Sequence, residues 1–310
     1  MRGVKYMIDA NSTTENFTRR ALWAQIDLDA AAHNMRVIRR HVGPDVRIAS
    51  VVKANAYGHG AVELSRVFAE NGADCFAVSS LDEGVELRRY AGITKDIFIL
   101  GHTDGRRTEE LLAYHIEPAV FNLKNAEYYS EEASRLGQTL QVHIAIDSGM
   151  SRVGFLPNEE TIEAIKKIAS LPRIEIRGIF THFATADEKD KTFTHEQFKR
   201  FMWVCTRLEN EGVHIPIRHC CNSAATLEMP AYHLDMVRPG IIQYGCEPSP
   251  DVPMEKFEFR PVMSLRCCAA HIKLIDKGAT VSYGRHFTCD QRRKIAVLPV
   301  GYADGYMRIL

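Results

Sequence analysis

Lys53 lies at a position where burial in the fold would decide whether its amine is a cation or a nucleophile. Lys53 ends the apolar run 47–53 and is closely followed by Tyr57, Gly58 and Gly60. A lysine at the end of a strand is either a surface cation or a buried amine. Burial disfavours the ammonium form, and the neutral amine is a nucleophile for carbonyl compounds. The glycines favour the second interpretation, because a glycine-rich turn lets the backbone approach a ligand closely.

Further polar residues follow other apolar runs. They are Asp147 and Arg152, Thr181 and His182, Asn222 and Ser223, and Arg238, Gly240 and Ile241. Ser223 begins one short helical segment, and Gly240 and Ile241 begin another. The free N–H groups at a helix N-terminus can bind phosphate, although a serine there can also serve only as a cap.

The remaining candidates each have a purely structural alternative. Arg238 is a permanent donor that could instead form an ion pair between strands. His182 and His219 could be hydrogen-bonded imidazoles of the core. Tyr283 and Tyr302 follow turns late in the chain, and a tyrosine there is most often an ordinary strand residue.

The elements that must position these residues alternate regularly. Short apolar runs of strand length are followed by segments of helical spacing. The strand-like runs are 47–53, 75–80, 97–100, 116–120, 141–147, 174–182, 217–222 and 234–239. The helical segments are 60–71, 81–90, 107–114, 123–136, 158–170 and 192–211. Near-continuous apolar strands suit a parallel sheet that is buried on both faces.

This alternation predicts an α/β fold, a (β/α)8 TIM barrel over residues 24–250. The alternative is an open doubly wound sheet, which the absence of a GxGxxG after the first run weakens. In a barrel the carboxyl ends of all strands meet at one rim, where the polar residues would gather. After a proline-rich stretch, residues 251–310 alternate as strands without a long helix. They predict a β domain, which the β-like segment 21–28 could join.

Composition limits the classes of function. Lys plus Arg number 39 and Asp plus Glu 39, so a nucleic-acid or anionic-membrane partner is not expected. The eight cysteines form no CxxC pair, so we expect reduced thiols and no metal site. The N-terminus lacks a signal-peptide pattern and no stretch approaches a transmembrane span, which predicts a cytoplasmic protein.

Taken together, the motifs resemble the alanine racemase family, the fold-type III enzymes that use pyridoxal 5'-phosphate (PLP). They are VVKANAYGHG (51–60), DSGMSRVGF (147–155), THFATAD (181–187), NSAAT (222–226), VRPGI (237–241), VSYG (281–284) and VGYADGY (300–306). The resemblance extends from about Trp23 to the end of the chain. VKANAYGHG is the most specific of these motifs, and their shared order adds to the specificity.

The resemblance implies roles for the candidates. Lys53 would bind PLP covalently and act as one catalytic base, and Tyr283 of the partner subunit in a head-to-tail homodimer would act as the second base. The phosphate would be held by Tyr57, Ser223, Gly240 and Ile241, and Asn222 would also belong to the cofactor site. His182 would lie against the cofactor ring, and Arg238, supported by His219, would donate to the pyridine nitrogen. Arg152 would bind the substrate carboxylate, and Tyr302 would line the substrate's path. The expected product, D-alanine, is a peptidoglycan precursor.

Two departures from the family pattern matter. The family often has a lysine two residues before Asp147, where this chain has Ala145, so chloride or a nearby carboxylate would have to orient Arg152. The family's C-terminal domain also continues beyond the VGYADGY motif, so the β domain is expected to be incomplete. Alternative functions are a serine or broad-specificity racemase, a PLP-dependent decarboxylase of the same fold type, and a non-catalytic PLP-binding protein.

Overall fold

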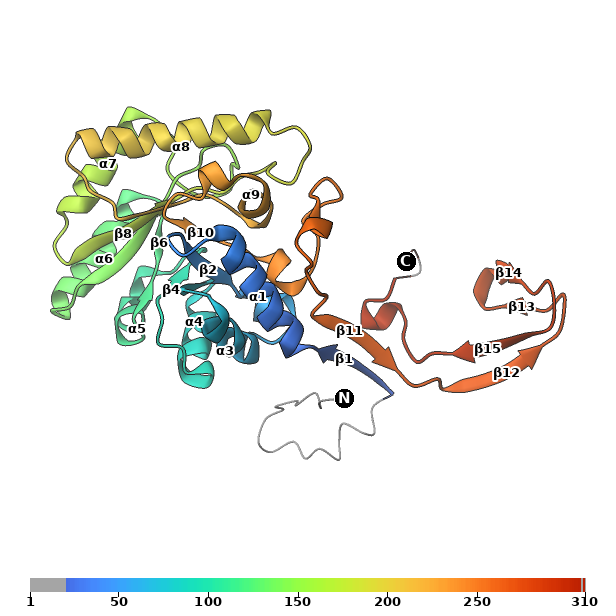
Figure 1. Ribbon diagram of the computed structural model, residues 1–310. Coiled ribbons are helices and arrows are strands. Elements are labelled where there is room, and N and C mark those ends of the chain that lie inside the picture. The colour runs from blue at the N-terminus through green and yellow to red at the C-terminus, as the bar shows by residue number, and fades with distance from the viewer. Residues whose placement is uncertain (1–20, 308, 310) are drawn as a thin grey trace. The chain divides into compact units, whose positions relative to one another are not determined.

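The chain forms two structural units. The computed structural model describes residues 21–307 and 309 (Figure 1). One unit is Leu28–Val262, and the other combines residues 21–27 with the described residues from Met263 onward. In the described residues no helix is long and apolar enough to cross a membrane. All eight cysteines are free thiols.

The unit Leu28–Val262 contains the parallel strands expected of the barrel. Its strands are β2 (Arg47–Val51), β3 (Cys75–Val78), β4 (Ile97–Ile99), β5 (Ile116–Glu117), β6 (Ala119–Val120), β7 (Leu140–Ala145), β8 (Ile174–Phe180), β9 (Ile217–His219) and β10 (Met236–Val237). They pair in parallel as β10-β2-β3-β4-β5 and β6-β7-β8-β9. Each lies within or close to a predicted apolar run, so the strand predictions are confirmed.

Two junctions complete the ring of strands. Pro118 separates β5 from β6, because proline has no N–H for the ladder. The edge strands β9 and β10 are joined by Asp235 N to Arg218 O (3.1 Å) and Arg238 N to Cys221 O (2.9 Å). The polar groups that follow the strands are thereby placed at one end of the barrel.

Helices surround these strands (Figure 1). They are α1 (Leu28–Val42), α2 (Lys53–Tyr57), α3 (Ala61–Asn71), α4 (Leu81–Glu86), α5 (Thr108–Ala113), α6 (Leu123–Arg135), α7 (Glu159–Ser170), α8 (Thr192–Asn210) and α9 (Ser223–Glu228). Helix α7 illustrates why these segments form helices that pack on the strands. The Asn158 side chain caps its first turn, and Ile162, Ile165 and Ile168 form one buried apolar stripe. The structure corrects the expectation that segment 21–28 is β-like throughout, since β1 (Leu22–Ile26) ends at Ile26 and α1 begins at Leu28.

The other unit consists of short antiparallel pairs. Its strands are β1, β11 (Met263–Cys267), β12 (His271–Ile275), β13 (Thr280–Val281), β14 (Phe287–Thr288) and β15 (Arg293–Val297). The pairs are β1 with β11, β12 with β15, and β13 with β14. Residues 268–270 separate β11 from β12. Tyr283 and Tyr302 begin the short 3-10 helices η7 (Tyr283–Arg285) and η8 (Tyr302–Asp304).

Candidate active site

Lys53 is presented by an unusual turn. It begins α2 directly after β2, and the next four residues, Ala54 to Tyr57, all have φ between 51° and 53°. This left-handed conformation costs roughly 1–2 kcal/mol per non-glycine residue. Such strain persists only where the surroundings fix it, and it is concentrated at functional sites. The turn brings the Tyr57 side chain back beside Lys53, whose Nζ lies 5.9 Å from the centre of the tyrosine ring.

A carboxylate from α4 fixes this turn. Glu83 Oε1 accepts a hydrogen bond from Ala54 N at 2.8 Å. Glu83 Oε2 accepts from Ser79 N at 2.7 Å and from Ser79 Oγ at 2.8 Å. On the other side, Asn55 Oδ1 accepts from Ala61 N at 2.8 Å. Glu83 could not be predicted from the sequence, because its role depends on contacts with the ends of two different strands.

The Lys53 amine is partly buried, in line with the nucleophile interpretation rather than a surface cation. Burial lowers its pKa, the positive charge of Arg152 lowers it further, and Glu83 opposes both effects. A lowered pKa increases the fraction of neutral amine at a given pH, and the neutral form attacks carbonyl carbon.

Tyr57, Ser223 and Gly240 form a small cradle. Gly240 N donates to Ser223 Oγ at 2.9 Å. A Cβ at Gly240 would lie 3.1 Å from Tyr57 Oη and 3.8 Å from Ser223 Oγ, so both hydroxyls face the bare glycine. The helix cap of α9 is Asn222, whose Oδ1 accepts from Ala225 N at 3.1 Å. Ser223 is therefore not the cap, and its hydroxyl proton is available to a ligand.

Arg238 is buried without an acidic partner among the described residues, so it does not form the interstrand ion pair that was its alternative. Its guanidinium donates to His219 Nδ1 (2.8 Å) and Thr181 O (2.6 Å), and a third contact reaches His182 Nδ1 at 3.4 Å. Burial lowers the pKa of Arg238 to about 10. It thus remains a cation at neutral pH, and it lies at the wall of the cavity described next.

His182 is held in its neutral form. Burial lowers its pKa to about 3, with further contributions from the charges of Arg238, Arg152 and Lys53. A neutral imidazole beside three cations can pack against a flat ring without adding to their repulsion.

These groups line two adjoining cavities at the carboxyl ends of the strands. The larger is about 360 Å³ and is bounded by Lys53, Tyr57, His182, Asn222, Ser223, Arg238, Gly240 and Ile241, among others. The smaller is about 210 Å³ and shares Lys53 and His182 with it. Arg152 and Ala145 line the smaller one, and Arg152 makes no hydrogen bond or ion pair to any described residue. An unpaired guanidinium there can bind an anion.

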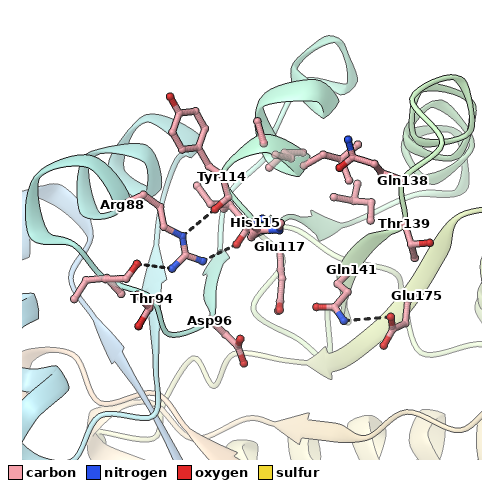
Figure 2. A pocket seen from close by; sticks show the side chains of 16 residues that line it. Arg88, Thr94, Asp96, Tyr114, His115, Glu117, Gln138, Thr139, Gln141 and Glu175 are labelled. Atoms are coloured by element: carbon pink, nitrogen blue, oxygen red, sulfur yellow. Dashed lines mark hydrogen bonds between the residues drawn. The ribbon is translucent and has the colours of Figure 1, made fainter.

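A larger hollow lies at the opposite, amino end of the strands. It is about 830 Å³ and is bordered by residues around the starts of β4, β5, β7 and β8 (Figure 2). Its arginine, Arg88, donates to the main-chain oxygens of Ile93, Lys95, Tyr114 and His115 and is therefore not free for a ligand. This end of a barrel commonly serves stability rather than catalysis.

Two predicted residues belong to the other unit. Tyr283 is 81% exposed and Tyr302 is 68% exposed. The barrel unit brings together all the other predicted site residues, with His219 behind Arg238. Fold and site thus define a (β/α)8 barrel protein with a lysine-centred cavity at its carboxyl-terminal rim.

Comparison with known proteins agrees with this class. Residues 26–248 match the family model "Alanine racemase, N-terminal domain" and residues 262–310 match "Alanine racemase, C-terminal domain". The chain therefore belongs to the alanine racemase family, and the resemblance and the fold class predicted from the sequence are confirmed.

Individual relatives cover most of the chain. It is 49% identical to an alanine racemase of Clostridium tetani over 94% of its length and 75% of the relative's. An alanine racemase of Methanococcus maripaludis is 45% identical over 93% and 77%. Among solved structures, alanine racemase of Clostridium difficile 630 gives a TM-score of 0.86 at 41% identity, covering 94% and 76% of the two chains. Alanine racemase of Bacillus anthracis with bound L-Ala-P gives 0.81 at 36%, covering 93% and 75%.

Proposed function

We propose that this chain interconverts L- and D-alanine with PLP held at Lys53. The observation that supports this most directly is the convergence of a partly buried amine, a hydroxyl cradle and a buried arginine around one cavity. The relatives named alanine racemase point to the same reaction. Its product would supply D-alanine for peptidoglycan in the cytoplasm.

The residues present fit PLP. The cradle at Gly240 offers two hydroxyl donors and no carboxylate, which suits a phosphate dianion. Lys53, with its lowered pKa, suits the aldehyde, and the neutral His182 ring suits the pyridine face. Arg238 would donate to the pyridine nitrogen and, as a cation, would disfavour its protonation. When bound, PLP withdraws electron density from the Cα of the amino acid.

Racemisation requires proton transfer on both faces of Cα. Lys53 would remove or return the proton on one face, and Tyr283 of a partner subunit would act on the other. Arg152, which has no hydrogen-bond or ion-pair partner among the described residues, would bind the substrate carboxylate, and Tyr302 would line the substrate's path. The high exposure of Tyr283 agrees with a role in the active site of another subunit. So do the exposed apolar side chains of the β unit, which include Leu265, Ile272, Leu274, Phe287 and Val297.

The test combines cofactor and turnover measurements on one preparation. The purified chain should be yellow, should lose that colour on borohydride treatment, and should form D-alanine from L-alanine and the reverse. Lys53→Ala should abolish both the colour and the turnover. Tyr283→Phe should keep the colour and lose turnover in both directions, because the forward and reverse reactions use the same two bases. A colourless chain that does not bind added PLP would refute the proposal.

A further inference from the structure

Four buried side chains connect the two ends of the barrel. Glu117 lies at the hollow at the amino ends of the strands (Figure 2), and its Oε2 is 2.7 Å from His143 Nε2. His143 Nδ1 is 3.1 Å from His219 Nε2, and His219 Nδ1 is 2.8 Å from Arg238 Nη1. The four side chains come from β5, β7, β9 and the end of β10. None is more than 7% exposed.

The chemistry of the two end groups, Arg238 and Glu117, fixes the direction of donation along this row of hydrogen bonds. A guanidinium can only donate, and an ionised carboxylate can only accept. His219 Nδ1 must therefore accept from Arg238, which leaves the proton on its Nε2 to be donated to His143 Nδ1. His143 in turn carries its proton on Nε2 and donates it to Glu117. Both rings are then neutral and share one tautomer.

The surroundings hold both rings in place and disfavour a positive charge on His219. Phe98 stacks on His143 at 4.8 Å and Phe180 stacks on His219 at 5.2 Å. Gly178 leaves room for the His143 ring, since a Cβ there would lie 2.4 Å from His143 Nδ1. Burial lowers the pKa of His219 well below its ordinary value, and the charge of Arg238 acts in the same direction.

We propose that Glu117 and His143 are positioning residues that fix the orientation of Arg238 from the opposite end of the barrel. This inference rests on the proposed function for the meaning of Arg238, which would face the pyridine nitrogen of PLP. With Glu117 in place, His219 presents only an acceptor to Arg238. Without it, water from the amino-end hollow can donate to His143 Nε2, which favours the opposite tautomer of both rings. His219 would then present an N–H to Arg238 and could not accept its hydrogen bond.

The first measurement needs no cofactor and no variant. Ring-nitrogen NMR of the cofactor-free chain should show both His143 and His219 neutral and protonated on Nε2. A proton on Nδ1 of either ring, or a doubly protonated ring, would overturn the proposal. This readout also separates the two proposals, because a chain that shows both tautomers but never racemises alanine refutes only the proposed function.

Variants test the effect on the site. Glu117→Leu should give mixed tautomers at His219 and lower kcat/KM by about 10- to 100-fold, as expected for outer hydrogen-bond partners of functional groups. Glu117→Gln should restore the tautomers and most of the activity, because its amide oxygen can still accept from His143.

The matched control is Glu175→Leu, which removes a carboxylate at the same hollow. Among the described residues, its side chain accepts a hydrogen bond only from Gln141 (3.2 Å). It should leave the tautomers and kcat/KM unchanged. Equal effects of the Leu variants at Glu117 and Glu175, or a Gln variant as impaired as Glu117→Leu, would overturn the proposal.

Discussion

Replacing Ser223 by alanine separates the two tasks of its hydroxyl group. In the cofactor-free protein its Oγ accepts the Gly240 N–H at 2.9 Å. An unpaired buried N–H costs about 1–3 kcal/mol. Here both residues line a cavity of about 360 Å³ that water can enter, so the loss should be at the lower end, about 1 kcal/mol. For a domain of this size, that corresponds to a fall in Tm of about 2–4 °C.

Under the proposed function, the second task would be donation to the phosphate of PLP. A hydrogen bond to a charged group contributes about 1.5–3 kcal/mol, so Ser223→Ala should weaken PLP binding by about 10- to 150-fold. Pyridoxal, which lacks the phosphate, should bind the variant and the parent equally. The assay is an absorbance titration of the cofactor-free protein with each compound. An unchanged ratio of the PLP and pyridoxal affinities would refute the assignment of Ser223 to the phosphate.

Ser65 provides a matched control. It is also a buried serine, but its Oγ has no hydrogen-bond partner among the described residues. Ser65→Ala should therefore leave both affinities unchanged and should not lower Tm. A fall in Tm equal to that of Ser223→Ala would show that loss of the hydroxyl volume, rather than of the hydrogen bond, causes the effect.

Three further predictions follow from the geometry around the site. Arg152 lowers the pKa of Lys53, and only the neutral amine would capture PLP. Arg152→Gln should therefore move the pH profile of PLP capture, measured by stopped-flow absorbance, toward higher pH. A shift to lower pH would contradict this. Glu83→Gln replaces a charged acceptor by a neutral one at the turn after Lys53, so urea unfolding should show a loss of about 1 kcal/mol, and no change would mean that the turn is held by other contacts. Burial raises the pKa of the Cys75 thiol to about 12, so a thiol reagent should modify the exposed Cys268 in the native state and Cys75 only after unfolding, as peptide mass analysis would show.

The barrel was predictable because its signals are local. Each buried parallel strand is a short run of apolar residues, and each helix has an apolar stripe, so both can be located without knowledge of the fold. Helix α1 was the exception, because it begins at Leu28, within the β-like segment 21–28, and only the structure shows that β1 ends at Ile26.

The sequence by itself also identified the residues that follow the strands. The carboxyl ends of barrel strands meet at one rim, so Lys53, His182, Ser223 and Arg238 could be predicted to lie together from topology alone. The shared order of the seven motifs indicated the alanine racemase family.

Tertiary structure decided how these groups act. The left-handed turn after Lys53 depends on a carboxylate from another βα unit, and no local pattern in 54–57 encodes it. Asn222, rather than Ser223, caps α9, which leaves the Ser223 hydroxyl for the cavity. In the sequence, Glu117 and His143 are only polar residues that interrupt apolar strands. The closure of the barrel is what aligns them with Arg238. The physical reason is that hydrogen-bond direction and burial depend on partners distant in sequence, whereas hydrophobic periodicity is a property of the local segment.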